Sequence, residues 1–336
     1  MTRTLITGGA GFIGYHLTRA LAADPDHDID VVDNWFRTRR ADDAFEALIK
    51  LANVQFMEFD ITQPREWDKL DRSYDQIYHL AAVNGTRYFY EIPHEVLRVN
   101  LLGVLNALRW LTKGTFPGKL VFASSSEIYA GVNEVGTLPI PTPEDVASAF
   151  GDLTNPRISY GVSKLAGELC VRHTAAAHGW RWAIVRYHNV YGPRMGQEHV
   201  IAALCERLIR RDNPLKLYGA DNRRAFCFID DAVQATRLVM ESDHANGEVV
   251  NIGNADEELS ILQLVQRCAR YAGYLPQIEE MPAPAGSTMR RCPEVSKLFR
   301  LTGFRARVGL DEGLAKTYQW YAAQRTVPVP TEIEHQ

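Results

Sequence analysis

The sequence predicts an α/β protein in which helices cover both faces of a doubly wound parallel sheet. Over the first two-thirds of the chain, short apolar runs alternate with segments of helical period, as in strand–helix–strand units. The length of 336 residues suits about two domains or one large α/β unit. Apolar residues make up 46% and charged residues 23%, which is the balance of an ordinary globular protein.

Seven apolar runs are predicted strands, and longer segments between them are predicted helices. The strands are Thr4–Thr7, Ile29–Asp33, Val54–Phe59, Gln76–Leu80, Lys119–Ser124, Trp182–Tyr187 and Glu248–Ile252. The helices are Ile13–Ala23, Ala41–Leu51, Glu95–Leu111 and Tyr160–His178. Because the seventh strand follows so late, we expect another segment to intervene before it.

The later part of the chain predicts a second, smaller lobe. The stretch Pro193–Phe228 and the chain after Gly253 alternate less regularly and contain more proline and glycine. Residues 326–336 are expected to fray, because they have two prolines and little hydrophobic content. The predicted division is one domain of residues 1–187 plus about 229–255, a smaller lobe of about 188–228 plus 256–325, and the tail 326–336.

Composition and charge exclude several classes of protein. A net charge of −4 provides no overall basic field for nucleic acid or an anionic membrane. No apolar run approaches the ~20 residues that a membrane span needs, and a strand at Thr4 leaves no room for a signal peptide. The five cysteines are scattered without a C-x-x-C pair, which indicates reduced thiols. We therefore expect a cytoplasmic protein without a nucleic-acid or membrane partner.

A glycine-rich turn follows the first predicted strand. In Thr7–Gly14, glycines at positions 8, 11 and 14 permit a tight turn and a close approach of the backbone to a pyrophosphate. The phosphates would lie on the helix N-terminus, where free N–H groups favour anions. Asp33 ends the second strand about 20 residues on, so its carboxylate can accept both ribose hydroxyls and repel a 2′-phosphate. The pattern predicts NAD rather than NADP.

Two alternatives accompany this prediction. A glycine-rich turn can also bind nothing. Arg37, Arg39 and Arg40 follow Asp33 closely and could soften the exclusion of NADP, although a solvated basic loop is the favoured interpretation.

Tyr160 and Lys164 place a phenol and an ammonium group four residues apart on one face of a predicted helix. A tyrosine with a pKa of about 10 is a poor base at neutral pH. A lysine one turn away, together with a positive nicotinamide ring, can stabilise the phenolate. The hydroxyls of Ser124–Tyr129 follow a strand, where open α/β sheets bind ligands. An exposed helix face that arose by chance is the alternative.

The order of these motifs resembles the extended short-chain dehydrogenase/reductases, and more narrowly the nucleotide-sugar epimerase/dehydratase family. The resemblance covers about residues 4–322. It implies a Rossmann-type domain that binds NAD, a C-terminal lobe that binds a nucleotide-diphosphate sugar, and a homodimer formed through helices such as Glu95–Leu111 and Tyr160–His178. The matching segments are Thr7–Gly14, Asp33, Asp60-Ile61, His79–Ala82, Asn100, Ser124–Tyr129, Tyr160–Lys164 and Arg186–Arg194.

The resemblance also implies residue roles. Tyr160 would take the proton from the sugar 4-hydroxyl, Lys164 would hold the nicotinamide ribose, and hydride would pass to NAD. The implied catalytic residues are Ser125, Glu127, Tyr160 and Lys164. The implied cofactor-binding residues are Gly8, Gly11, Phe12, Ile13, Gly14, Asp33, Asp60, Ile61, Leu80, Ala81, Ala82, Asn100, Tyr160 and Lys164. The implied substrate-binding residues are Ser126, Asn189, Arg224 and Arg291, the two arginines suiting a diphosphate.

Glu127 bears on the reaction that follows oxidation at C4. Beside a 4-ketone, the C5 proton is acidic, a C6 hydroxyl can leave and a C5 carboxylate can be lost. A 4-epimerase needs no further base, whereas elimination needs a group near C5 and C6, and Glu127 is a candidate whose pKa burial can adjust. A carboxylate that caps a loop or pairs with an arginine is the alternative.

Finer similarities lean towards UDP-glucuronate decarboxylases and sugar-nucleotide dehydratases. Ser125-Ser126-Glu127 aligns with their Thr-Ser-Glu or Thr-Asp-Glu, although serine replaces the usual threonine. Asn84–Tyr90 matches no one branch, and its aromatic residues either line the sugar pocket or pack in the core. The segments most like the decarboxylases are Asn155–Arg157, Arg224–Phe226, Asn251–Glu258 and Arg291–Glu294.

The sequence therefore favours decarboxylation or dehydration after C4 oxidation. A 4-epimerase and a 4-dehydrogenase that releases the ketone remain open. A catalytically silent NAD-binding sensor is disfavoured, because Ser125, Tyr160 and Lys164 are all present. Dispersed histidines without ligand spacing give no reason to predict a metal site.

Overall fold

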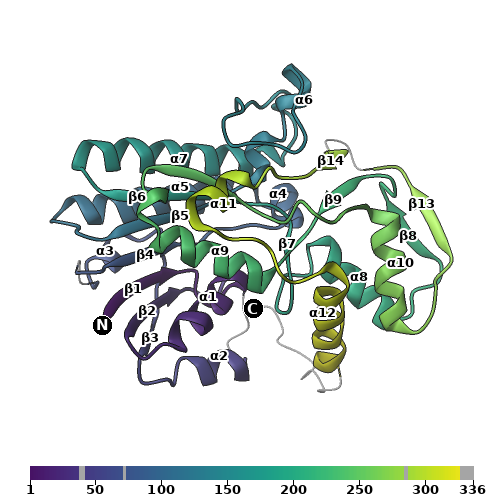
Figure 1. Ribbon diagram of the computed structural model, residues 1–336, viewed down its shortest axis with the longest axis horizontal. Coiled ribbons are helices and arrows are strands. Elements are labelled where there is room, and N and C mark those ends of the chain that lie inside the picture. The colour runs from purple at the N-terminus through teal and green to yellow at the C-terminus, as the bar shows by residue number, and fades with distance from the viewer. Residues whose placement is uncertain (38–41, 71–72, 284–286, 326–336) are drawn as a thin grey trace.

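A seven-stranded parallel sheet forms the centre of the protein (Figure 1). The computed structural model describes residues 1–37, 42–70, 73–283 and 287–325. The strand order β11-β6-β5-β4-β1-β2-β3 confirms the predicted α/β class, and all seven predicted strands lie within two residues of their expected bounds. The strands are β1 (Thr2–Thr7), β2 (His27–Asp33), β3 (Val54–Glu58), β4 (Gln76–His79), β5 (Lys119–Ser125), β6 (Arg181–Tyr187) and β11 (Glu248–Ile252).

The order in which successive strands are added to the sheet reverses between β1 and β4. After β3 the chain returns to pair β4 with the opposite side of β1, so that Thr7 lies beside His79. At such a point, the connections that leave the two strands diverge to opposite faces and open a crevice at the carboxyl ends. The glycine-rich turn leaves β1 at this edge, and Ser125 ends β5 next to it.

Helices cover both faces of the sheet, and each face has its own hydrophobic core. Leu17 and Leu21 of α1 pack in one core with Val239 of α9, whereas Leu108 of α5 and Val171 of α7 pack in the other. The helices around the sheet are α1 (Phe12–Ala22), α2 (Asp43–Leu48), α3 (Pro64–Trp67), α4 (Thr86–Glu91), α5 (Pro93–Thr112), α7 (Ile158–His178), α9 (Ile229–Glu241) and α11 (Ser296–Thr302). The short helix α6 (Val132–Val135) lies away from the sheet, beyond α7 (Figure 1).

Helix α2 is shorter than the predicted Ala41–Leu51. It begins after Asp42, whose carboxylate accepts hydrogen bonds from the backbone N–H groups of Ala44 and Phe45. This side-chain cap fixes the start of the helix. Residue 41, like Arg39 and Arg40, lies outside the described residues.

The later elements form small sheets and helices that lie to one side of the central sheet (Figure 1, right). The small sheets pair β7 (Val190–Tyr191) with β10 (Cys227–Phe228), β8 (Leu215–Tyr218) with β13 (Ile278–Met281), and β9 (Arg223–Ala225) with β12 (Glu258–Ser260) and β14 (Arg290–Arg291). The helices are α8 (Val200–Ile209), α10 (Ile261–Ala272) and α12 (Leu310–Arg325).

The predicted division into two lobes stays a prediction. Helix α9 and strand β11 return to the central sheet, as expected for residues 229–255, but α11 also packs against them. The predicted tail, 326–336, lies outside the described residues. Among the helices of the described ranges, none combines the length and apolar character that crossing a bilayer requires.

Candidate active site

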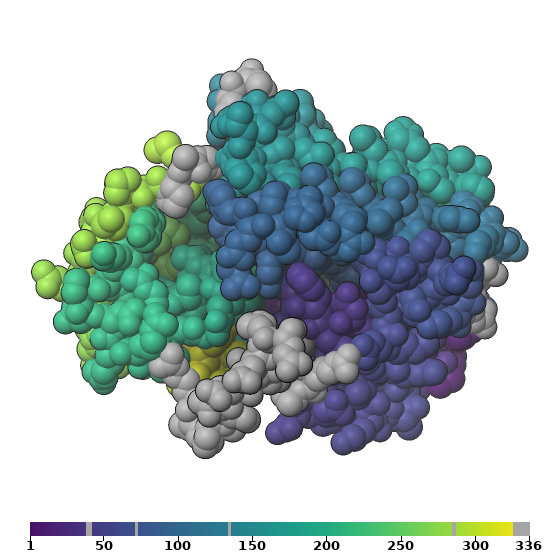
Figure 2. All heavy atoms as spheres, turned by 180° about the vertical axis from the view of Figure 1, so that it is seen from behind, coloured from purple at the N-terminus to yellow at the C-terminus, as the bar shows by residue number. Residues whose placement is uncertain are grey.

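A cavity of about 1280 Å³ opens at the carboxyl ends of the central strands. It exceeds the roughly 300–1,000 Å³ of a typical small-molecule pocket, so it has room for two ligands side by side. Figure 2 shows the two groups of segments that meet around it, green C-terminal segments beside purple and blue N-terminal ones. The predicted site residues that line it are Gly8, Gly11, Phe12, Ile13, Gly14, Asp33, Asp60, Ile61, Leu80, Ala81, Ala82, Ser125, Ser126, Glu127, Tyr160, Lys164, Asn189, Arg224 and Arg291.

The glycine-rich turn fits a pyrophosphate group. A Cβ atom at Gly14 would lie 2.1 Å from the carbonyl oxygen of Gly8, and one at Gly8 would lie 2.7 Å from Cα of Ala81. Gly8 also has a φ of +75°, which side chains rarely adopt. Gly11 is the N-cap of α1 and provides no side-chain cap, so the helix N-terminus presents backbone N–H groups at the cavity wall.

Asp33 is held in place at the end of β2. Its carboxylate accepts hydrogen bonds from the backbone N–H groups of Ala10, at 3.1 Å, and Trp35, at 2.8 Å. Burial raises the pKa of Asp33, although these hydrogen bonds act in the other direction. The fixed carboxylate fits the hydroxyls of an adenosine ribose, and with the turn it makes the site suitable for NAD.

Asn100 is the predicted site residue that does not line the cavity. Its Oδ1 accepts a hydrogen bond from the backbone N–H of Val83, at 2.8 Å, and its Nδ2 donates to Oγ of Ser163, at 3.0 Å. Asn100 is buried behind the wall and ties the segment after β4 to α7. Its amide therefore holds the cavity wall in place from the protein interior and does not face the cavity.

Two ion pairs cross one end of the cavity, and sequence reasoning missed both. Arg37 Nη2 lies 3.5 Å from Oε2 of Glu198, and Arg194 Nη1 lies 2.9 Å from Oδ1 of Asp42. All four residues line the cavity. The pairs join the segment that follows β2 to the segment that precedes α8. Arg37 is thus engaged by a carboxylate rather than being a solvated charge of the loop.

Tyr160 and Lys164 lie on α7, one turn apart, as the sequence predicts. The Lys164 Nζ atom lies 5.8 Å from the centroid of the Tyr160 ring, and the Phe89 ring stacks on Tyr160 at 5.2 Å. Asn84, Tyr88 and Phe89 line the cavity, so part of Asn84–Tyr90 faces it.

The pKa values of Tyr160 and Lys164 differ from the expectation that the lysine stabilises the tyrosine phenolate. Burial raises the pKa of Tyr160, and the charge of Glu127 adds to this, while a hydrogen bond with Ser125 acts in the other direction. Burial also lowers the pKa of Lys164 to about 7. Lysine alone therefore does not produce a phenolate here, and a further positive charge at the site is needed to lower the tyrosine pKa.

A buried ion pair anchors α7 beneath these residues. Glu168, one turn after Lys164, accepts two hydrogen bonds from the Arg186 guanidinium at 2.9 and 2.7 Å. Both side chains are buried, and Arg186 also donates to the Tyr129 hydroxyl at 2.7 Å. The pair thus connects α7, strand β6 and the 3-10 helix Ser126–Tyr129 that carries Glu127.

Glu127 lies among arginines. Its Oε1 is 3.0 Å from Nη1 of Arg291 and 3.5 Å from Nη2 of Arg157. Burial favours a higher pKa for Glu127, but Arg291, Arg157 and the more distant Arg224 outweigh it and lower the pKa to about 2. The sequence considered both a base tuned by burial and a carboxylate paired with an arginine. In the structure the pairing dominates, and the carboxylate is ionised.

Arg157 is a residue that sequence reasoning did not assign to the site. Its segment was singled out as similar to decarboxylases, but no role was given to the side chain. It precedes Tyr160 by three residues at the start of α7, and this spacing places two side chains on one helix face. The spacing of three residues between Arg157 and Tyr160 could therefore have indicated that Arg157 belongs to the site.

The fold and the cavity together define an NAD-dependent enzyme with a Rossmann-type sheet and room for a second ligand. Residues 4–253 match the model of the NAD dependent epimerase/dehydratase family. The chain belongs to this family, and it is an enzyme of the nucleotide-sugar epimerase/dehydratase class.

Relatives with assigned activities include decarboxylases. The chain is 33% identical to the UDP-N-acetyl-alpha-D-glucosaminuronate decarboxylase of Bacillus cytotoxicus, over 95% of this chain and 97% of the relative. It is 31% identical to UDP-glucuronic acid decarboxylase 1 of Danio rerio, over 99% of this chain and 74% of that protein.

Solved structures of similar fold include 4-epimerases. UDP-glucuronic acid 4-epimerase from Bacillus cereus, in complex with UDP-glucuronic acid and NAD, is 25% identical with a TM-score of 0.84, covering 96% of this chain and 100% of that one. UDP-glucose 4-epimerase from Thermotoga maritima with UDP-glucose is 26% identical with a TM-score of 0.84, at the same coverage.

Proposed function

We propose that this protein is an NAD-dependent lyase that removes the carboxylate of a UDP-linked uronate after oxidising its C4 hydroxyl. The observation that carries the proposal is the position of Glu127. It is an ionised carboxylate in the wall of the cavity, held between Arg291 and Arg157. The decarboxylases among the relatives support the same reaction.

Oxidation at C4 relies on Ser125, Tyr160 and Lys164. Ser125 holds the sugar hydroxyl against Tyr160, whose phenolate accepts its proton. NAD, when bound, supplies the acceptor for the hydride that leaves C4, and its nicotinamide carries positive charge. That charge adds to Lys164 and opposes the burial that raises the pKa of Tyr160.

Substrate binding relies on Arg224 and Arg291. They are register partners on β9 and β14, and both line the cavity. Two forked guanidinium groups at neighbouring positions suit the two negative charges of a nucleoside diphosphate. Asn189, whose Nδ2 donates to the carbonyl oxygen of Ala225 at 2.9 Å, lies beside them and completes the wall.

The charge of Glu127 favours decarboxylation over dehydration. Loss of a C6 hydroxyl needs an acid that protonates the leaving group, and a carboxylate with a pKa of about 2 is not protonated at neutral pH. Loss of carbon dioxide needs no such acid. The bond between C5 and the carboxylate breaks, and its electron pair forms an enolate with the C4 ketone. C5 then takes up a proton from water, and C4 takes its hydride back, so that no NAD is consumed.

A nearby negative charge also assists this step. The charge of Glu127 repels the substrate carboxylate, whereas it has no charge interaction with neutral carbon dioxide. Pairing with Arg157 and Arg291 weakens this repulsion, so the effect is largest when the diphosphate draws Arg291 away. Arg157 and Arg291 hold Glu127 in its ionised state while the diphosphate competes for Arg291.

A second candidate is 4-epimerisation, which the Bacillus cereus neighbour favours because its complex holds UDP-glucuronic acid. In that reaction the 4-keto sugar rotates in the site and takes its hydride back on the opposite face, and Glu127 has no chemical role. A 4-dehydrogenase that releases the ketone differs in its net consumption of NAD.

Mass analysis of the products distinguishes these reactions. The purified protein is incubated with NAD and UDP-glucuronic acid, UDP-N-acetylglucosaminuronic acid or UDP-glucose as a neutral control. We expect a product lighter by carbon dioxide from one of the uronates and no such product from UDP-glucose. A product lighter by water, or one of unchanged mass with inverted C4, would replace the proposal with dehydration or epimerisation.

We further propose that the protein forms a homodimer through α5 and α7. These helices pack against each other and expose Leu102, Leu105 and Leu169, which are 37%, 46% and 49% accessible. Exposed apolar side chains on adjacent helices favour burial by a second copy. Light scattering should give a dimer mass for the wild type and a monomer for Leu105→Glu; a wild-type monomer would end this proposal. A cytoplasmic location stays a prediction.

A further inference from the structure

The sheet formed by β12, β9 and β14 carries arginines on both of its faces. Arg223 lies in register with Arg290, and Arg224 with Arg291. Because successive side chains of a strand point to opposite faces, each pair occupies a different face. Arg224 and Arg291 line the cavity, so Arg223 and Arg290 belong to the outer face.

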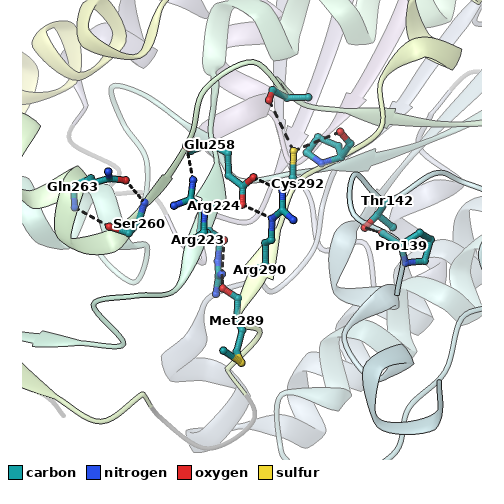
Figure 3. A network of polar contacts seen from close by, with 12 residues as sticks. Pro139, Thr142, Arg223, Arg224, Glu258, Ser260, Gln263, Met289, Arg290 and Cys292 are labelled. Carbon is teal, nitrogen blue, oxygen red and sulfur yellow. Dashed lines mark hydrogen bonds and ion pairs between the residues drawn. The ribbon is translucent and has the colours of Figure 1, made fainter. Parts of the chain in front are cut away.

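Glu258 joins the two outer arginines. Its carboxylate accepts two hydrogen bonds from Arg290, at 2.7 and 2.8 Å, and one from Nε of Arg223, at 3.3 Å (Figure 3). Arg223 also donates to the Glu258 backbone carbonyl at 3.2 Å. The arginine side chains are 45% and 48% exposed, whereas that of Glu258 is only 12% exposed.

This contact spans the full width of the small sheet. Glu258 lies on β12 and pairs with Ala225 of β9, which is the middle strand. Its carboxylate reaches across β9 to Arg290 on β14, the opposite edge strand. Strand β14 consists of two residues, so its backbone ladder alone holds it only weakly.

On the inner face, the two neighbouring arginines repel each other and share no carboxylate of this sheet. Burial, together with repulsion by Arg291, lowers the pKa of Arg224 to about 9. The like charges of Arg224 and Arg291 repel each other across β9 and β14. Arg224 also donates hydrogen bonds to the backbone carbonyl oxygens of Thr288 and Met289, just before β14. On the outer face, the shared carboxylate of Glu258 draws the same two strands together, one residue away from the repelling pair.

We propose that Glu258 is a positioning residue for the diphosphate: by bridging Arg223 and Arg290, it sets the spacing at which Arg224 and Arg291 meet the substrate. This inference rests on the proposed binding of a nucleotide-diphosphate sugar. Glu258 does not touch the substrate itself. It acts through the two strands, so it should affect binding of the diphosphate and leave the chemistry at C4 and C5 unchanged.

Glu258→Gln tests the inference with UDP as the probe. We expect calorimetry to show binding of UDP weakened about tenfold, within the range of coupling between residues of one network. With the reactive UDP-sugar, KM should rise by a similar factor while kcat, NAD content and melting temperature stay near the wild-type values. The matched control is Glu312→Gln, which removes an exposed ion pair with Lys316 at 2.7 Å on α12. It should leave UDP binding unchanged.

A double-mutant cycle tests whether Glu258 acts through the inner arginines. In an Arg291→Ala background, Glu258→Gln should cause much less further loss of UDP affinity than it causes alone. Equal UDP affinity for wild type and Glu258→Gln, or full additivity in the cycle, would overturn the inference. Failure of the wild type to bind UDP would instead overturn the proposed function, so the two failures are distinguishable.

Discussion

Nη1 of Arg291 lies 3.0 Å from Oε1 of Glu127, joining β14 of the C-terminal segments to the turn after β5. The arginine proposed to bind the diphosphate is therefore also a partner of the carboxylate proposed to act at the sugar. A diphosphate that draws Arg291 away leaves Glu127 with Arg157, at 3.5 Å. Binding at one end of the substrate is thereby coupled to the charge environment at the other.

Arg157→Gln should make the rate sensitive to acid. Arg157 lowers the pKa of Glu127 against the opposing effect of burial, so its removal moves this pKa up from about 2. In the wild type Glu127 stays ionised down to pH values well below neutrality. In the variant it protonates at a higher pH than in the wild type, and kcat should decline as the pH falls towards the ordinary carboxylate range.

The pH profile of kcat provides the measurement. Arg157→Lys keeps a positive charge and should behave more like the wild type than like Arg157→Gln. Superimposable profiles for wild type and Arg157→Gln would show that Arg157 does not control the charge of Glu127.

Tyr160→Phe should lower the turnover rate about a hundredfold or more, the scale of a positioned acid–base group. The hydroxyl is lost, while the ring that stacks on Phe89 is kept. Tyr90→Phe is the matched control, because Tyr90 is 48% exposed on α4 and does not line the cavity. Near-full turnover by Tyr160→Phe would exclude the tyrosine as the base.

Glu127→Gln should separate oxidation from the loss of the carboxylate. Ser125, Tyr160 and Lys164 are kept, so C4 oxidation proceeds, but the ionised side chain at the sugar is gone. We expect a 4-keto sugar or NADH to accumulate, visible as NADH absorbance during a single turnover. A product rate equal to that of the wild type would remove Glu127 from the chemistry.

Lys164→Met should stabilise the NAD-free protein near pH 7 while abolishing turnover. Burial lowers the pKa of Lys164 from 10.5 to about 7, so the folded protein binds fewer protons than the unfolded chain between these values. Wild-type stability therefore rises with pH in this window. Below it, the buried charge costs roughly 5 kcal/mol, because each unit of pKa shift corresponds to about 1.4 kcal/mol.

Denaturant titrations at several pH values provide the test. The stability advantage of Lys164→Met should be largest at or below pH 7 and shrink towards pH 10.5, where the lysine is neutral in both folded and unfolded chains. An advantage that is independent of pH would point to packing alone.

The central sheet and the cofactor turn could be predicted because their signals are local. Strands buried on both faces appear as continuous apolar runs, and the turn at Gly8–Gly14 needs glycine for steric reasons. Tyr160 and Lys164 share one helix face by spacing alone. Asn100 was placed in the site by resemblance, but it supports the wall from behind.

The ion pairs could not be predicted in the same way. Arg291 and Glu127 are 164 positions apart in the chain, and their meeting depends on the packing of two small strands against the central sheet. The pKa of Glu127 is lowered because these arginine partners outweigh burial, which alone would raise it. Likewise, the pair between Arg37 and Glu198 joins distant segments, which is why the sequence predicted only a solvated charge at Arg37.

The fate of the substrate carboxylate tests the central claim most directly. UDP-glucuronic acid and UDP-N-acetylglucosaminuronic acid, each with an isotopic label in the carboxyl carbon, are turned over by the wild type and by Glu127→Gln. The account predicts that the wild type releases the label from one of them as carbon dioxide, in equal amount to the sugar product, and that Glu127→Gln releases far less. Retention of the label in a turned-over product of the wild type would contradict it.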